Sequence, residues 1–213
     1  MTPWFEIIDS GDTEYSIPLA CGVWATLALA RAWRALAAWT VLFGAVVVIV
    51  LLSKIGYRGW GSGIPALEFR SISGHAARAA ALWPVLLALL ARAAGLASVR
   101  WCVALGYGYA VLMAVLLVRF DRHAPAEALA GLVLGAVASA VFLRHVPRHA
   151  PLPGDRAPRW ALALPGGALV CAAVFLADPA AHTTLITRTA LYLSGHATPY
   201  SWRAWERAGA ATP

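Results

Sequence analysis

The stretch VLFGAVVVIVLLS, residues 41–53, is an unbroken apolar run, and it decides the class of fold. A helix needs roughly 20 mostly apolar residues to cross a bilayer, and this run belongs to an uncharged segment that begins at residue 37. Other apolar runs of similar length occur along the chain. We therefore expect six membrane-spanning segments, at about residues 17–30, 37–53, 76–96, 103–118, 125–143 and 160–177.

The overall composition supports a membrane protein. The chain has 213 residues, of which 61% are hydrophobic and 13% charged, whereas a soluble domain is typically about 25% charged. Cys21, Cys102 and Cys171 lie in separate apolar runs, so neither a disulfide framework nor a zinc site is indicated. The predicted fold class is all-α: a polytopic integral membrane bundle of about six transmembrane helices plus short interfacial helices.

We expect one membrane-embedded domain over residues 1–213, with its core at 37–143. The leader, residues 1–16, is acidic and contains no Lys or Arg, so it is predicted to be an interfacial segment rather than a cleaved signal peptide. The tail, residues 178–213, is too short and polar in its helical part to span. With Trp202 and Trp205 it is predicted to lie at the membrane interface.

Loop charges predict which side each loop occupies. Six spans place one group of arginines together on the inner side, as the positive-inside rule requires; these are residues 31, 34, 92, 100, 144, 148, 156 and 159. The leader and the loops at 54–75 and 119–124 then face the outer side. The predicted location is a bacterial inner membrane, with these loops facing the periplasm or the cell exterior. The net charge of +7 is spread over short loops, so no nucleic-acid partner is expected.

Two histidines stand at the starts of predicted spans, where ionisable groups are costly and usually functional. Ser73, Gly74 and His75 open one span, and a serine there can cap the helix, whose free N–H groups suit phosphate. His123 lies four residues before Glu127 at the start of another span. A carboxylate bonded to one ring nitrogen fixes the tautomer and leaves the other nitrogen free to attack.

Blander interpretations of these residues remain open. An interfacial histidine beside a glutamate that the helix dipole favours would explain either loop alone. A metal site formed by His75, His123 and Glu127 is conceivable, but nearby cations would repel a metal, so no cofactor is expected. A Ser-His-Glu hydrolase is less favoured, because Ser73 occupies a capping position and no nucleophile elbow surrounds it.

The order of these motifs resembles the membrane-bound type 2 phosphatidic acid phosphatase family, over roughly residues 37–143. The motifs are Lys54, then SGH at 73–75, then His123 and Glu127 followed by AGLVLG. The resemblance implies a six-helix bundle that hydrolyses lipid phosphates or pyrophosphates through a phosphohistidine. It also implies a role for each residue: His123 is the nucleophile, His75 protonates the leaving group, Glu127 orients His123, and Lys54, Ser73 and Gly74 bind phosphate.

The chain departs from the family pattern at several positions. Gly61-Ser62 stands where the family has Arg-Pro, Ile72 replaces the proline before SGH, and Leu117 replaces an arginine before the histidine. The third-motif acid is Glu127, where Asp is usual. Two arginines of the phosphate site are therefore missing from their family positions.

We expect Arg58, one turn after Lys54, and Arg119, one turn before His123, to replace them. The predicted partners are a lipid phosphate substrate and membrane lipids. The alternative is a catalytically degenerate relative that acts as a lipid-phosphate binder, carrier or membrane assembly partner. The letters SGH recur at residues 194–196, where coincidence in an alanine- and glycine-rich chain is the simpler explanation.

Overall fold

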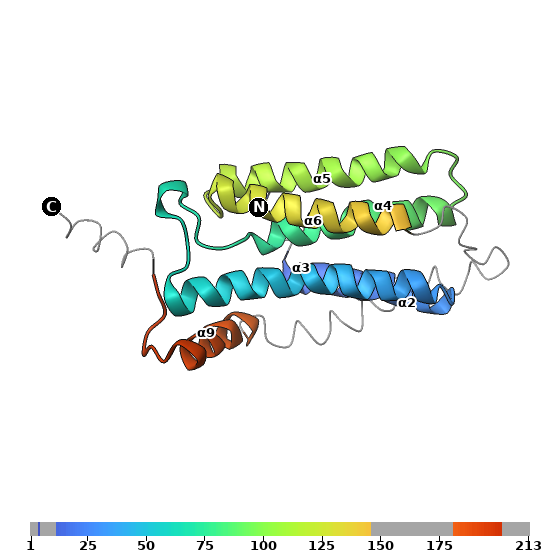
Figure 1. Ribbon diagram of the computed structural model, residues 1–213. Helices are drawn as coiled ribbons and strands as arrows, with labels where there is room; N and C mark the ends of the chain where they lie inside the picture. The colour runs from blue at the N-terminus through green and yellow to red at the C-terminus, as the bar shows by residue number, and fades with distance from the viewer. Residues whose placement is uncertain (1–3, 5–11, 146–180, 202–213) are drawn as a thin grey trace.

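The computed structural model describes Trp4 and residues 12–145 and 181–201, and over these residues the fold is all-α, as predicted (Figure 1). One short 3-10 helix and an isolated bridge between Ile64 and Phe69 interrupt the helical pattern. The helices are α2 (Thr13–Leu29), α3 (Trp33–Trp60), η1 (Pro65–Leu67), α4 (Gly74–Ala93), α5 (Val99–Arg119), α6 (Pro125–His145) and α9 (Ala181–Ser194).

Within the described ranges, four helices are long and apolar enough to cross a membrane. They are α3, α4, α5 and the part of α6 that ends at Arg144, and they coincide with four of the six expected spans. The first expected span is a 17-residue helix, α2. The expected span at 160–177 lies outside the described residues. The polytopic membrane architecture is therefore confirmed.

The main difference from expectation is the length of α3. The helix continues past the predicted end at Ser53 to Trp60, so Lys54 and Arg58 lie on a helix rather than in a loop. Gly61 ends α3 in the left-handed conformation, with φ of 66°. A residue without a Cβ adopts this conformation readily, which is why glycine so often follows the last turn of a helix.

Successive helices run in alternating directions, so four helix ends meet at one end of the bundle (Figure 1). The C-terminal ends of α3 and α5 lie there with the N-terminal ends of α4 and α6. Two backbone bonds tie this end together: the Ile72 N–H donates to Ser53 Oγ at 2.9 Å, and the Ser73 N–H donates to the Glu127 carbonyl at 3.1 Å. Both histidine loops consequently lie at the same end.

Small residues let α6 approach α4 closely. A Cβ on Gly131 would lie 2.4 Å from the Ser73 carbonyl oxygen, and one on Gly135 would lie 2.1 Å from the Ala77 carbonyl oxygen. Ser139, one turn further, donates a hydrogen bond to the Ala80 carbonyl at 2.8 Å. This small-xxx-small spacing is the usual basis of close helix packing in membranes. It holds the first turn of α6 against the first turn of α4.

The segment around α9 closes over the end of α3. The Tyr200 N–H donates to the Arg58 carbonyl at 2.9 Å, and His196 Nδ1 bonds to the Gly59 carbonyl at 2.7 Å. The second SGH, residues 194–196, therefore lies at the C-terminal end of α9 and contacts the backbone of α3. It is not part of the histidine pair described next.

Candidate functional site

His75 and His123 lie face to edge at the end of the bundle where the four helix ends meet. Their ring centroids are 5.9 Å apart and the ring planes are inclined by 62°. His75 comes from the first turn of α4, and His123 from the loop before α6. Their side chains are 24% and 17% exposed respectively. The pair is thus largely enclosed and still reachable from one side.

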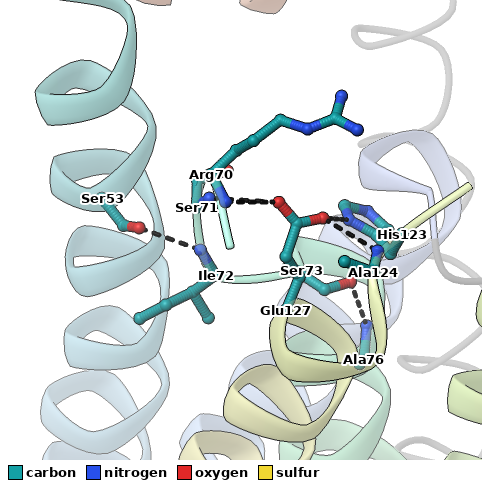
Figure 2. Close-up of polar contacts among 9 residues, drawn as sticks. All are labelled: Ser53, Arg70, Ser71, Ile72, Ser73, Ala76, His123, Ala124 and Glu127. Carbon is teal, nitrogen blue, oxygen red and sulfur yellow. Dashed lines mark hydrogen bonds and ion pairs between the residues drawn. The ribbon is translucent and has the colours of Figure 1, made fainter. Parts of the chain in front are cut away.

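Glu127 joins this pair to the surrounding loops through four accepted hydrogen bonds (Figure 2). One oxygen accepts from His123 Nδ1 at 2.8 Å and from the Ala124 N–H at 3.3 Å. The other accepts from the N–H groups of Arg70 at 2.9 Å and Ser71 at 3.3 Å. An ionised carboxylate only accepts hydrogen bonds, so the proton lies on His123 Nδ1. Nε2 is therefore the nitrogen left for chemistry.

Ser73 caps α4, as the sequence predicts, but both of its polar groups are already bonded. Its hydroxyl oxygen accepts from the Ala76 N–H at 3.4 Å, and its own N–H donates to the Glu127 carbonyl at 3.1 Å. The expectation that Ser73 itself binds phosphate therefore gains no support from this geometry. Gly74 and His75 follow in the first helical turn, where backbone N–H groups have no partner within the helix.

A carboxylate that the sequence analysis did not assign to the site contacts His75. Asp12 Oδ1 lies 2.6 Å from His75 Nε2. His75 Nδ1 is buried and has no hydrogen-bond partner in the part of the chain that the structure describes. Burial alone would raise the pKa of Asp12, but the hydrogen bond and charge of His75 outweigh burial and hold that pKa below its usual value. Asp12 was interpreted only as one of several leader acids that set topology.

Arg78 is the second residue that the sequence analysis missed. It lies one turn after His75 on α4, is 9% exposed, and its Nε donates to Ser16 Oγ at 2.7 Å. Its guanidinium packs against Gly74, where a Cβ would lie 2.8 Å from Arg78 Nη1. Arg78 and Lys54 line one cavity of about 80 Å³. An arginine inside an alanine-rich span was a signal of function in itself.

The two arginines expected to complete the phosphate site lie elsewhere. Arg58 Nη1 donates to the Thr183 carbonyl at 3.1 Å and also contacts the Thr187 hydroxyl, so its guanidinium is engaged with α9. The turn that separates it from Lys54 carries it about 6 Å further along α3. Arg119 is exposed at the end of α5, on the side of a groove between α5 and α6. The structure thus corrects the expected placement of both.

Metal ligands were also considered at this end of the bundle. Within residues 12–145 and 181–201, no three His, Cys, Asp or Glu side chains are arranged to hold a metal ion. The site as described consists of two histidine–carboxylate pairs, Asp12 with His75 and Glu127 with His123, with Lys54 and Arg78 beside them.

This fold and site define a class of protein: a membrane-embedded helical bundle with paired histidines at one membrane end. The PAP2 superfamily matches residues 53–151, which include both histidines. An uncharacterized 22.5 kDa protein in the cps region of Klebsiella pneumoniae is 37% identical over 141 residues, or 66% of this chain and 68% of the relative. No solved structure matches the chain significantly. The chain belongs to the PAP2 superfamily, which supports a phosphatase-type activity.

Proposed function

We propose that this protein hydrolyses a lipid-linked phosphate or pyrophosphate at the extracytoplasmic face of a membrane, through a phosphohistidine. The observation that carries the proposal is the pair of imidazoles, 5.9 Å apart, each bonded through one nitrogen to a carboxylate. Such a pair supplies a nucleophile and a proton donor on neighbouring rings. Family membership supports the same chemistry.

The reaction follows from the free nitrogens. His123 Nε2 attacks phosphorus, the N–P bond forms, and the bond from phosphorus to the leaving oxygen breaks. His75 gives a proton to that oxygen. Water then attacks the phosphohistidine, His75 takes up a proton from the water, and the N–P bond breaks to release phosphate. Glu127 keeps His123 oriented and stabilises the positive charge that the ring acquires.

Charge on the transferred phosphoryl group must be neutralised by donors already in place. We assign this role to Lys54, Arg78 and the free N–H group of Gly74. Arg78 is preferred to Arg58 and Arg119 because it lies one turn from His75 and shares a cavity with Lys54. A buried guanidinium is also a strong, planar donor to phosphate oxygens.

A groove next to the site supports a substrate with a hydrocarbon chain. It has a volume of about 390 Å³ and an almost wholly apolar lining between α5 and α6, which includes Val111, Val115 and Leu129. Arg119 and Pro125 also line it, close in sequence to His123 on either side. Ligand sites commonly have volumes of about 300–1,000 Å³. A lipid chain in this groove would bring its phosphate to the histidine pair.

The proposal is tested by phosphate release from purified protein in detergent. The substrates are phosphatidate, phosphatidylglycerol phosphate, a prenyl pyrophosphate and a lipid A phosphate, each with and without EDTA. We expect release from at least one of them, unaffected by EDTA and abolished by His123→Ala. Binding of these lipids without any release would instead favour the binder or carrier, an alternative that the positions of Arg58 and Arg119 keep in view.

A further inference from the structure

The first turn of α2 contacts two residues of the site at once. The Asp12 carboxylate lies 2.6 Å from His75 Nε2, and Ser16 Oγ accepts from Arg78 Nε at 2.7 Å. Ser16 also donates its hydroxyl proton to the Asp12 carbonyl at 2.7 Å. His75 and Arg78 are one turn apart, so they share a face of α4. One helix start thus contacts both the proposed acid and the proposed phosphate ligand.

Asp12 makes its contact at the expense of ordinary helix capping. It occupies the N-cap of α2, where an aspartate usually accepts a hydrogen bond from an N–H group of the first turn, a bond whose loss typically costs about 1 kcal/mol. Here its side chain makes no capping bond. The carboxylate is turned toward His75 instead. Local helix stability therefore does not explain where this side chain lies.

The electrostatic surroundings keep Asp12 ionised. Arg78 and Arg122 add positive charge near it, beyond the charge and hydrogen bond of His75. Because an ionised carboxylate only accepts, the proton between them lies on His75 Nε2. His75 Nδ1 is then the nitrogen left to exchange a proton, and it has no partner in the described chain.

We propose that Asp12 and Ser16 are positioning residues for the phosphatase site: Asp12 orients His75 for protonation of the leaving group, and Ser16 holds Arg78 in the phosphate cradle. The inference rests on the proposed function. It adds to the family resemblance, since both residues lie outside the matched region, residues 53–151. The leader is therefore part of the site, in addition to any role in topology.

The two positioning roles predict different kinetic signatures. Asp12→Asn should reduce kcat about 10–100-fold for an alkyl lipid phosphate, part of the 10²–10⁴-fold that a general acid typically contributes. With an aryl phosphate such as p-nitrophenyl phosphate, whose leaving group needs little protonation, the loss should be at most about 3-fold, with KM nearly unchanged. Ser16→Ala should reduce kcat/KM about equally for both substrates, because every substrate needs the cradle.

Three further variants keep the test decisive. Glu14→Gln removes an acidic charge from the same turn of α2, forms no hydrogen bond with His75 among the described residues, and should behave as wild type. Asp12→Glu retains the carboxylate and should recover part of the alkyl-phosphate activity. His123→Ala gives the background rate. All variants are compared at equal yields of monodisperse, thermally characterised protein.

Two results would overturn the inference. Equal losses of activity on alkyl and aryl phosphates in Asp12→Asn, with no recovery in Asp12→Glu, would reduce Asp12 to a structural contact. Higher activity in Asp12→Asn would show that the carboxylate obstructs the site rather than orients it. In both cases wild-type protein still releases phosphate, whereas a wild type inactive on every substrate would refute the proposed function itself.

Discussion

Glu127 carries two tasks at the scale of single residues. One oxygen orients His123, and the other holds the backbone of Arg70 and Ser71, which belong to the loop that leads into α4. Its side chain is 5% exposed, so these bonds are made almost out of water. A single carboxylate thereby links the loop before α4 to the nucleophile before α6.

Replacing Glu127 with Gln should damage both tasks. An amide has only one acceptor oxygen, so its NH₂ group must face either the imidazole side or the Arg70 and Ser71 N–H groups. Leaving buried donors unsatisfied costs about 1–3 kcal/mol, and turnover should fall at least about 10-fold. Thermal unfolding and phosphate release measure the two effects. Glu68→Gln, at an exposed position of the same loop, is the control. Wild-type values for both measurements in Glu127→Gln would contradict this account.

The Asp12–His75 contact predicts a pH dependence of stability. The folded pKa of Asp12 lies below its ordinary value of 3.8, so the ionised form stabilises the fold above that pH. This stabilisation is lost as the pH falls through the folded pKa. The difference in Tm between wild type and Asp12→Asn should be largest above about pH 5 and should vanish in stronger acid. The Asp12 side chain is 43% exposed, so salt should shrink the difference. A difference that grows toward low pH would contradict the contact.

At the scale of elements, the contact between α4 and α6 sets the position of the site. Gly131 and Gly135 allow the two backbones to touch, and the first turn of α6 then places Glu127 beside Ser73. The spacing GLVLG, residues 131–135, was visible in the sequence, but it was interpreted only as part of a family resemblance. Its physical meaning is helix packing.

Gly135→Ala should therefore impair a site that it does not touch. A Cβ there would lie 2.1 Å from the Ala77 carbonyl oxygen and 2.8 Å from the Ala81 nitrogen. Neither backbone atom can yield without moving a helix, and such overpacking typically costs about 1–3 kcal/mol. Both Tm and kcat should fall. Gly108→Ala, where nothing lies within 4 Å of the new methyl group, should leave both nearly unchanged. Equal behaviour of the two variants would remove the packing argument.

How far the sequence predicts this element arrangement depends on the range of each interaction. The spans of α3, α4, α5 and α6 follow from apolar runs, and the His123–Glu127 bond follows from helical spacing. Asp12 meets His75 across 63 positions in sequence, and no local periodicity encodes such a contact. Arg58 was misplaced for the same reason, because its partners Thr183 and Thr187 lie on a distant helix.

At the scale of the whole molecule, the alternating helices separate two kinds of ends. Asp12, the loop at 61–73 and the loop at 120–124 share the end that holds the histidines. The arginines at 31, 34, 92 and 100 lie in or next to the connections at the opposite end. The positive-inside rule then favours an extracytoplasmic site.

This orientation predicts opposite labelling of two single cysteines. On a background without Cys21, Cys102 and Cys171, Ser62→Cys should react with an impermeant maleimide added to intact cells. Ala97→Cys, in the connection between α4 and α5, should react only after the membrane is opened. Both positions are exposed, so accessibility within the fold is matched. Labelling of Ala97→Cys alone from outside would invert the orientation.

The most direct test of the central claim is to trap the phosphoenzyme. Protein is mixed briefly with a phosphate-labelled lipid substrate, denatured in alkali and digested, and the labelled peptide is sequenced by mass spectrometry. We predict an acid-labile, alkali-stable phosphate on His123, absent from His123→Ala and more abundant in wild type than in Glu127→Gln. Steady turnover with no label on His123 at any quench time, or turnover that survives in His123→Ala, would contradict covalent catalysis by this histidine.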